Sequence, residues 1–254
     1  MDIKSIMTRP VATVTRKTTI KEAVQKIAKK SISCVVVTEK RTPIGIFTKF
    51  DLLSVLDGGQ DMVKTAMETV MHTPVMPIEE NDDLFSAARQ MERLEVRRFI
   101  IVDRENRLAG IVTNGNIIKA FAQRAFPYNQ PLAALAQPGL TATLKTPLKK
   151  IARMMIEHRS ACVVILKNNK PVGIITEGLF AKLAAKGAKP LAGTAETKMM
   201  KKFTMAENTA SLRETVINMV KMKMHEIVVV ASDKRHFGVI TQRDLVRFIE
   251  KSQI

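Results

Sequence analysis

The chain has 254 residues and carries 41 lysines and arginines against 24 aspartates and glutamates, a formal net charge of +17. Hydrophobic residues make up 46% and charged residues 26%, so the chain can bury a core and global disorder is excluded. Nowhere do 18 apolar residues follow one another, and the first residues lack the basic and then apolar pattern of a signal peptide. We therefore expect a cytoplasmic protein of one large or two ordinary domains, without membrane contact.

Local signatures of catalysis and of metal binding are missing from the sequence. The two cysteines, Cys34 and Cys162, cannot form a disulfide framework, and the four histidines stand without metal-ligand spacing. There is no glycine-rich phosphate loop, no serine nucleophile elbow and no HExxH motif. The sequence therefore predicts a protein that is not an enzyme, holds no metal and requires no cofactor.

The first predicted elements form one unit of secondary structure. An amphipathic helix is expected over residues 20–28, because its apolar residues follow the i, i+3, i+4, i+7 spacing of one buried face. A β-branched strand follows at Cys34–Val37, and after a polar turn a second strand ends at Gly45–Thr48. Residues Phe50–Leu56 continue as a further helix.

The same elements return three more times, at intervals of 64 residues. The helical stripes of the four repeats open at Ile20, Leu84, Leu148 and Leu212. The second strands all end in a glycine, two apolar residues and a threonine, at Gly45–Thr48, Gly110–Thr113, Gly173–Thr176 and Gly238–Thr241. Such continuous apolar strands are typical of sheets that are covered on both faces. The predicted unit is therefore strand, helix, strand, strand, helix, four times over.

Breaker residues divide the four repeats into two pairs. The stretch Ala125–Gly139 contains Pro127, Pro131 and Pro138, so we place one module at 1–127 and the other at 128–254. The repeats themselves span about 1–62, 63–127, 128–190 and 191–254. A unit of about 60 residues buries too little surface to be stable alone, which favours pairing of neighbours. Most of the excess positive charge lies in the second module.

The repeated unit resembles the CBS (cystathionine β-synthase) domain. That domain ends in the motif G-h-h-T-x-x-D, where h is apolar, and often opens with a phrase similar to Met-Thr-x-Pro. Here the opening phrase stands at Ile6–Val11 and Val70–Val75, fades to Gln137–Leu140, and leaves only Met199, Met200 and Phe203 in the fourth repeat. The resemblance covers nearly the whole chain. It implies an α/β fold of the CBS type (α+β), in which four tandem β-α-β-β-α repeats pair as two pseudo-twofold Bateman modules with nucleotide clefts between repeats.

The resemblance implies ribose and phosphate contacts at the closing motif. A threonine hydroxyl and free N–H groups at a helix start can hold phosphate, and a carboxylate one turn later can accept both ribose hydroxyls. Two repeats keep both residues: Thr48 with Asp51, and Thr241 with Asp244. The other two have Asn116 and Leu179 in place of the aspartate, and whether they bind a ligand stays open. A plain capping box is the alternative for Thr-x-x-Asp, although all four helices need a cap and only two keep the carboxylate.

Basic residues near these motifs are candidates for phosphate contacts. Arg97 and Arg98 resemble the basic phrase that grips phosphate in the γ subunit of AMP-activated protein kinase. His225 keeps the histidine position of that phrase in repeat 4, but Glu226 stands where an arginine would, which weakens a second phosphate site. Secondary candidates lie inside the closing motifs: Lys49 and Arg243. The alternative for any one of them is an ordinary solvated surface charge.

An adenine pocket is expected from apolar residues at strand entries. The candidates are Ala12, Thr13 and Ile32 in repeat 1, and Met205 and Met224 in repeat 4. Methionine adapts well to ligands, but at such spacing it is more often part of a core. Cys34 and Cys162 are equivalent and are expected to be small core residues rather than a redox pair.

The leading hypothesis is a non-enzymatic regulatory protein that binds an adenine nucleotide (AMP, ADP or ATP) or S-adenosylmethionine as its regulatory ligand. A second, so far unknown protein would read the resulting conformational change. The two modules could close into a disk by themselves or through a homodimer. Binding of nucleic acid is the alternative, because +17 is a large charge, although aromatic residues make up only 4% and Tyr128 is the one tyrosine. A nucleotide hydrolase is disfavoured, because no base and nucleophile pair is evident.

Overall fold

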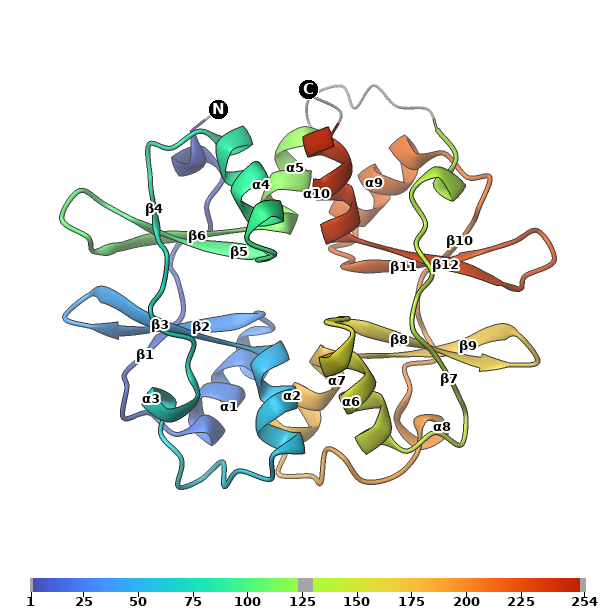
Figure 1. Cartoon of the computed structure of the whole chain (residues 1–254), viewed down its shortest axis with the longest axis horizontal. Helices are drawn as coiled ribbons and strands as arrows, with labels where there is room; N and C mark the ends of the chain where they lie inside the picture. The colour runs from blue at the N-terminus through green and yellow to red at the C-terminus, as the bar shows by residue number, and fades with distance from the viewer. Residues whose placement is uncertain (1, 123–129, 252–254) are drawn as a thin grey trace.

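The structure is a computed structural model that describes residues 2–122 and 130–251. It contains four three-stranded sheets, one for each repeat (Figure 1). In each sheet the first strand runs parallel to the second and the third pairs antiparallel with the second. The α/β fold with four β-α-β-β-α repeats that the sequence predicts is confirmed. The proposed division at residue 127 falls in residues 123–129, outside the described residues, as does Tyr128.

The first two repeats have closely matching elements. Repeat 1 comprises a short 3-10 helix η1 (Ile3–Ser5), β1 (Thr13–Val14), α1 (Ile20–Lys30), β2 (Cys34–Glu39), β3 (Thr42–Thr48) and α2 (Lys49–Asp57). Repeat 2 comprises α3 (Met67–Val70), β4 (Ile78–Glu79), α4 (Leu84–Arg93), β5 (Arg98–Val102), β6 (Leu108–Thr113) and α5 (Asn114–Ala122). The Thr19 side chain accepts from the Glu22 N–H and Glu22 accepts from the Thr19 N–H, so a capping box fixes the start of α1.

The second pair of repeats follows the same order. Repeat 3 comprises η2 (Leu132–Ala134), β7 (Thr141–Thr143), α6 (Leu148–Glu157), β8 (Cys162–Lys167), β9 (Lys170–Thr176) and α7 (Glu177–Ala185). Repeat 4 comprises α8 (Ala195–Lys198), β10 (Met205–Glu207), α9 (Leu212–Lys221), β11 (Glu226–Val230), β12 (His236–Thr241) and α10 (Gln242–Lys251). The long helices bury the stripes that the spacing predicts, including Leu148 and Ile151 on α6.

Sheets of neighbouring repeats pack face to face. Cys34 and Val36 of β2 lie in one buried cluster with Ile100 and Val102 of β5. An equivalent cluster joins repeats 3 and 4, with Cys162 on β8 as the counterpart of Cys34. Both cysteines are free and buried, so they are core residues, and burial raises the pKa of the Cys162 thiol. Repeats 1 and 2 therefore share one core surface, and repeats 3 and 4 another.

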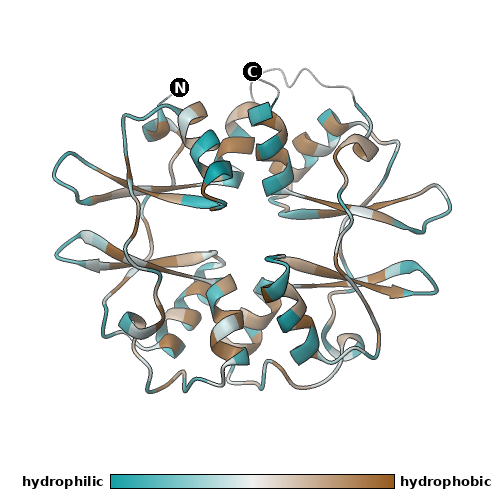
Figure 2. Cartoon of the chain, in the orientation of Figure 1, coloured by the Kyte–Doolittle hydropathy of each residue, from teal (hydrophilic) through white to brown (hydrophobic). Residues whose placement is uncertain are grey.

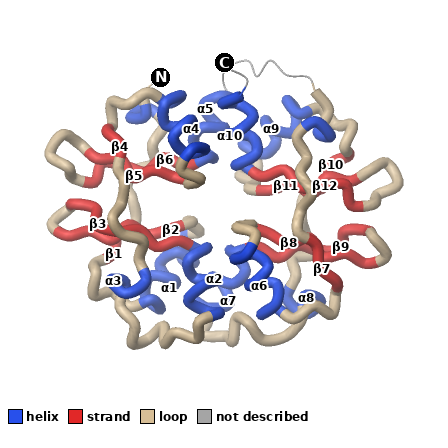
Figure 3. The backbone as a smooth tube through the Cα atoms, viewed as in Figure 1, coloured by secondary structure: helices blue, strands red, loops and turns tan. Residues whose placement is uncertain are grey.

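Helices join the two halves of the chain into one closed disk. Helices α1 and α2 of repeat 1 pack against α6 and α7 of repeat 3, and α4 and α5 of repeat 2 pack against α9 and α10 of repeat 4. Leu53 of α2 is fully buried beside Phe180 of α7. The two helical layers lie at the top and bottom of the view, with the sheets between them (Figure 3). Apolar residues gather where the helices meet (Figure 2), so the single chain closes the disk without a second copy.

The opening phrase of each repeat crosses to the other repeat of its module. Thr8 forms a bridge to Ile111, and His72 forms one to Ile46; Gln137 and Met200 do the same with repeats 4 and 3. This crossing explains two features of the sequence motif. A Cβ at Gly45 would overlap the Met71 sulfur, and Gly110 and Gly173 make the same room for Met7 and Met199. The glycine of the closing motif and the methionine of the opening phrase are therefore complementary parts of one contact.

Candidate nucleotide site

The four closing motifs lie toward the middle of the disk. The hairpin loops between the second and third strands point to its outer edge, so the opposite ends of these strands face the middle (Figure 1). At that end each closing threonine pairs with the first residue of the strand beside it. These first residues are Cys34, Arg98, Cys162 and Glu226. The residue after each threonine opens the next helix. Two sets of four equivalent positions, the strand starts and the helix starts, therefore surround the centre.

Repeat 1 holds Thr48 and Asp51 in a capping arrangement. Asp51 Oδ2 accepts the Thr48 N–H at 2.7 Å, and Thr48 Oγ1 accepts the N–H groups of Phe50 and Asp51 at 3.1 and 3.2 Å. The other carboxylate oxygen of Asp51 lies 2.9 Å from Nε2 of His72, which belongs to the opening phrase of repeat 2. This contact raises the pKa of His72, through the hydrogen bond first and the negative charge second. Both carboxylate oxygens of Asp51 therefore have hydrogen-bond partners within the protein.

Repeat 4 holds the equivalent pair with one carboxylate oxygen to spare. Asp244 Oδ2 accepts the Thr241 N–H at 2.8 Å and the Thr241 hydroxyl at 2.7 Å. Within the described part of the chain, its Oδ1 has no hydrogen-bond partner. The carboxylate thus caps α10 with one oxygen and has the other available for a ligand.

The degenerate repeats differ from each other. Asn116 caps α5 with its amide oxygen, which accepts the Thr113 N–H at 3.0 Å. Its amide nitrogen donates to the Ile6 carbonyl at 2.8 Å, so this side chain ties repeat 2 to the opening phrase of repeat 1. In repeat 3, Leu179 packs against the core, and Thr176 makes no capping hydrogen bond. Capping and ligand binding are therefore compatible uses of this position, and the cap by itself does not decide between them.

Arg97 connects three repeats. Its Nη1 lies 3.4 Å from Glu177 Oε2, its Nη2 donates to the Arg159 carbonyl at 3.0 Å, and its guanidinium carbon lies 5.6 Å from the centre of the Phe50 ring. Burial lowers the pKa of Arg97, and Glu177 opposes that shift. Arg97 thus spans from repeat 2 to repeats 1 and 3, in the middle of the molecule.

Arg98 is a candidate cation with unused buried hydrogen-bond donors. Its Nε and Nη1 are buried, and among the described residues they have no hydrogen-bond partner. An unsatisfied buried donor costs about 1–3 kcal/mol, and more when it is charged. The guanidinium lies close enough to Lys49, the first residue of α2, to lower the pKa of that lysine. Both features suit a site for an anion.

The other basic candidates differ in burial. Lys49 is partly buried, and its pKa is lowered mainly by that burial, while Glu177 opposes the shift. Arg243 Nη2 lies 3.6 Å from Glu95 Oε1, and its Nε is buried without a partner in the described residues. His225 is exposed, and its backbone carbonyl accepts the Gln242 N–H at 3.1 Å. Lys49 and Arg243 therefore lie at the centre, whereas the His225 side chain is solvated.

Two carboxylates share the centre with these cations. Burial and the nearby Glu177 raise the pKa of Glu226 to about 7, while Arg97 and Lys49 act in the opposite direction. We call Lys49, Arg97, Arg98, Glu177 and Glu226 the central cluster. Sequence reasoning missed Glu177, although it follows Thr176 as Lys49 follows Thr48. It also missed Glu95, Arg159 and His72, whose contacts join residues far apart in the chain.

The adenine candidates fall into different environments. Ala12 and Ile32 pack against the same buried cluster of repeat 1, and Thr13 lies on β1 beside them, where its carbonyl accepts from Lys26 Nζ at 2.6 Å. Met224 packs against the core of repeats 2 and 4, and its sulfur lies 2.8 Å from the Thr204 hydroxyl. Met205 is about half exposed, at 51%. The repeat 1 candidates thus form a more continuous apolar surface than the repeat 4 candidates do.

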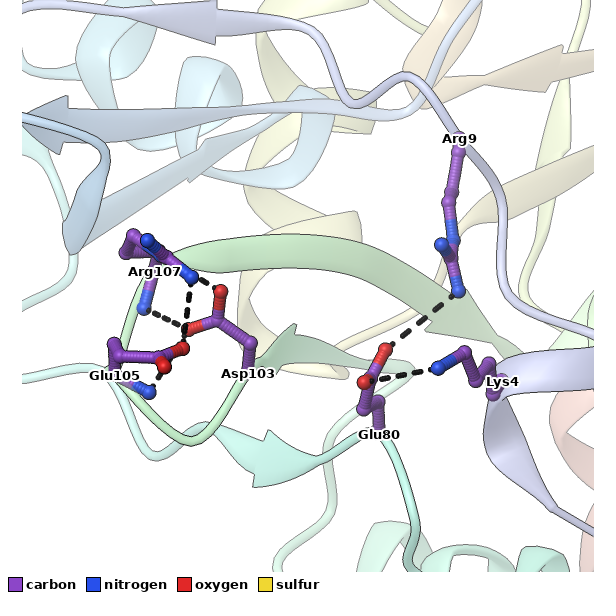
Figure 4. Close-up of polar contacts among 6 residues, drawn as sticks. All are labelled: Lys4, Arg9, Glu80, Asp103, Glu105 and Arg107. Carbon is purple, nitrogen blue, oxygen red and sulfur yellow. Dashed lines mark hydrogen bonds and ion pairs between the residues drawn. The ribbon is translucent and has the colours of Figure 1, made fainter.

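A pocket of about 420 Å³ lies elsewhere, at the outer side of repeat 2. Its charged residues already pair with one another (Figure 4): Lys4 Nζ lies 3.1 Å from Glu80, and Arg107 lies 2.8 Å from Asp103 and 2.7 Å from Glu105. Arg9 reaches the second Glu80 oxygen at 3.8 Å. The pocket lies at the turn between β5 and β6, opposite the strand end that carries the closing motif.

Across residues 2–122 and 130–251, no three His, Cys, Asp or Glu side chains come together in a way that could hold a metal ion. Over the same ranges, none of the helices combines the length and the apolar character needed to cross a bilayer.

Comparison with known proteins places this geometry in a family. A sequence profile described as the CBS domain matches residues 3–58, 67–123, 134–184 and 195–251. Uncharacterized protein MK0525 of Methanopyrus kandleri is 30% identical over 152 residues, which cover 59% of this chain and 69% of that protein. CBS domain-containing protein YhcV of Bacillus subtilis is 33% identical over 116 residues, 45% of this chain and 81% of that protein.

A solved structure shares the fold of the whole chain. Protein MJ1225 of Methanocaldococcus jannaschii, described as a candidate archaeal homologue of γ-AMPK, matches with a TM-score of 0.89 at 21% identity. The match covers 98% of this chain and 100% of that one. Four matched domains, the closed disk and the repeated threonine motif lead to one conclusion: the chain belongs to the CBS domain family.

Proposed function

We propose that the protein is a non-enzymatic regulatory protein that binds an adenine nucleotide in clefts between CBS repeats. The observation that carries this proposal is the guanidinium of Arg98, whose buried Nε and Nη1 have no hydrogen-bond partner among residues 2–122 and 130–251 and which lies near Lys49 at the start of α2. A buried cation with free donors is stabilised by an anion, and the helix start with Thr48 offers N–H groups to the same anion. Asp51 and Asp244 are the proposed ribose ligands, with Thr48 and Thr241 beside them.

Binding would be transmitted through the residues that join the modules. Arg97 and Arg243 are proposed phosphate contacts, and they also pair across the module boundary with Glu177 and Glu95. A phosphate that draws Arg97 away from Glu177 would weaken a contact between repeats 2 and 3. The ligand thus has different contacts in two arrangements of the modules, which is what an allosteric response requires. A partner protein would read the arrangement.

The first test is the chemical identity of the ligand. The protein is purified and denatured, and the released small molecules are analysed by ultraviolet absorbance and mass spectrometry. The chain has no tryptophan and a single tyrosine, so a retained adenine dominates the absorbance. AMP, ADP, ATP and S-adenosylmethionine are then titrated into the empty protein by calorimetry.

A matched pair of variants separates ligand binding from helix capping. Asp51→Asn keeps the cap, because Asn116 caps α5 in the same way, but it removes the carboxylate. Glu22→Gln changes a capping carboxylate on α1 that lies outside the proposed site. We expect Asp51→Asn and Asp244→Asn to weaken nucleotide binding at least tenfold with little change in melting temperature, and Glu22→Gln to leave affinity unchanged. Equal affinities for all four proteins would contradict the proposal.

Nucleic-acid binding is a second candidate, favoured by where the charge lies. Repeats 1 and 3, which share the lower helical layer, carry 21 basic and 8 acidic residues, whereas repeats 2 and 4 carry 20 and 16. Many of the repeat 3 lysines are exposed: Lys149, Lys150, Lys182, Lys186 and Lys189. One basic side of a disk is the electrostatic footprint of a polyanion site.

This candidate is tested by retention of DNA and RNA on a filter at increasing salt. A variant in which Lys149, Lys150, Lys186 and Lys189 are glutamine is expected to lose binding. A control with glutamine at Lys221 and Lys223 of repeat 4, which are also exposed, is expected to keep most of it. The absence of any retention at low salt would rule the candidate out.

A further inference from the structure

The central cluster contains both cations and carboxylates, because equivalent positions in different repeats carry different residue types. Arg98 and Glu226 each begin the strand that pairs with the closing threonine, in repeats 2 and 4. Lys49 and Glu177 each follow that threonine, in repeats 1 and 3. At both positions one repeat supplies a cation and another repeat supplies a carboxylate, and the fold brings all four near one another.

The carboxylates limit how much negative charge the centre can take. With both ionised, the three cations of the cluster exceed the two carboxylates by a single formal charge. A phosphomonoester carries about −1.5 to −2 at neutral pH, and each further phosphate adds more. In a partly buried site, like charges repel far more strongly than they do in water. One phosphate already exceeds this single positive charge, and each additional phosphate adds negative charge beside Glu226 and Glu177.

We infer that Glu226, supported by Glu177, is a specificity-determining residue that makes the centre select a nucleoside monophosphate over the corresponding di- and triphosphate. The inference rests on the proposed nucleotide function and names the ligand class of that site. Glu177 is also held by Arg97 at 3.4 Å, whereas Glu226 makes no ion pair within 4 Å in the described residues. Glu226 is therefore the carboxylate whose charge an incoming anion meets directly.

The groups around Glu226 predict how its effect changes with pH. Glu177 of α7, Arg97 ahead of β5, Lys49 of α2 and Cys162 of β8 interact with it electrostatically. Since its pKa is raised to about 7, Glu226 is mostly neutral at pH 6 and ionised at pH 8. Its repulsion of an anion is thus absent at pH 6 and present at pH 8. The Cys162 thiol stays neutral in this range, because its pKa is raised by burial.

Calorimetric titration of AMP, ADP and ATP into the wild-type protein and Glu226→Gln tests the inference. Glu196→Gln is the control, because it removes the same formal charge from an exposed position on α8. At pH 8 we expect wild type to bind AMP more tightly than ATP, and Glu226→Gln to gain up to about tenfold for ATP but at most about threefold for AMP. A carboxyl group with a pKa of about 7 can be neutralised at pH 8 for about a tenfold loss in affinity, which sets the upper limit of the gain. At pH 6 the two proteins should converge, and Glu196→Gln should match wild type throughout.

The outcomes distinguish this inference from the proposed function. Tight binding of AMP and ATP alike, unchanged in Glu226→Gln, would overturn the selectivity and leave the nucleotide site in place. Failure of wild type to bind any of the three nucleotides at either pH would overturn both. Melting temperatures of the variants accompany the titrations, and Glu177→Gln provides a second, smaller shift toward ATP if Glu226→Gln does not fold.

Discussion

At the scale of single residues, several side chains at the centre of the disk are in environments that ordinarily lower the stability of a folded protein. Arg98 has buried donors that no described residue pairs with, Glu226 is a carboxyl group with a raised pKa, and Asp51 is held by a histidine from another repeat. Such features are expected where a ligand completes the structure, because the ligand supplies the missing partners. Two predictions follow from individual side chains.

His72 is expected to compete with the ligand for Asp51. The protonated imidazole binds the carboxylate most strongly, so the competition is present below the raised pKa of His72 and fades as the pH rises through it. The His72 side chain is 73% exposed, so the pair is worth at most about 1 kcal/mol. His72→Ala should bind nucleotide about two- to fivefold more tightly than wild type at pH 6 and equally at pH 8.5. Calorimetry at the two pH values checks this, and an equal gain at both would contradict it.

Arg98 is expected to lower the stability of the empty protein in return for binding. Arg98→Met keeps much of the side-chain volume and removes the unsatisfied buried donors. We expect the ligand-free variant to gain about 1 kcal/mol in free energy of unfolding and to lose at least tenfold in nucleotide affinity. Thermal unfolding with and without nucleotide measures both effects. A variant that is less stable than wild type when empty would show that the guanidinium has a structural partner.

At the scale of elements, one position at the start of a helix has three different roles. The carboxylate of Asp244 caps α10 with one oxygen, the amide of Asn116 caps α5 and also ties down the opening phrase, and Leu179 only packs. The motif therefore changes its chemistry from repeat to repeat while the backbone stays the same. In repeat 2 the amide nitrogen has a specific structural task, because it donates to the Ile6 carbonyl.

Restoring the family's aspartate in repeat 2 is expected to harm the protein. Asn116→Asp preserves the cap but places a carboxylate against the Ile6 carbonyl and the Thr8 hydroxyl, where the amide nitrogen now donates. We expect a loss of about 1–3 kcal/mol in free energy of unfolding. No additional nucleotide should bind, since the opening phrase then lacks its anchor. Denaturant unfolding and calorimetric stoichiometry test this, and a gain of one bound nucleotide per chain would contradict it.

At the scale of the whole molecule, apolar helix faces hold the two modules together and ion pairs surround them. Arg153 lies 2.9 Å from Asp57 and Arg247 lies 2.6 Å from Glu92, each pair joining the two modules. The apolar contacts have the larger effect, because one continuous core includes α4, α5, α9 and α10. Exposed ion pairs contribute little by themselves and chiefly set the orientation.

An isolated module is expected to associate with itself. A fragment of residues 1–122 would expose the apolar faces of α1, α2, α4 and α5 that the second module covers. Two copies can bury these faces against each other in a closed disk, since the repeats are related. We expect the fragment to sediment as a dimer. The full chain needs no second copy to cover these faces, because its own second module already does so. A monomeric, stably folded fragment would contradict the prediction.

The sequence by itself determined the repeat, the order of the elements and the closing motif. These features depend on local spacing: helical stripes, β-branched runs and caps recur every 64 residues and identify the elements wherever they lie. It also located Thr48, Asp51, Thr241 and Asp244 at helix starts, as the structure places them.

The tertiary structure alone decided which charges meet. His72 reaches Asp51 because the opening phrase crosses to the other repeat, and Arg97 reaches Glu177 because the modules close on each other. The positive charge, which the sequence assigns mainly to the second module, lies in space on the side formed by repeats 1 and 3. Periodicity is a local property of the chain, whereas these contacts depend on packing between repeats that no spacing encodes.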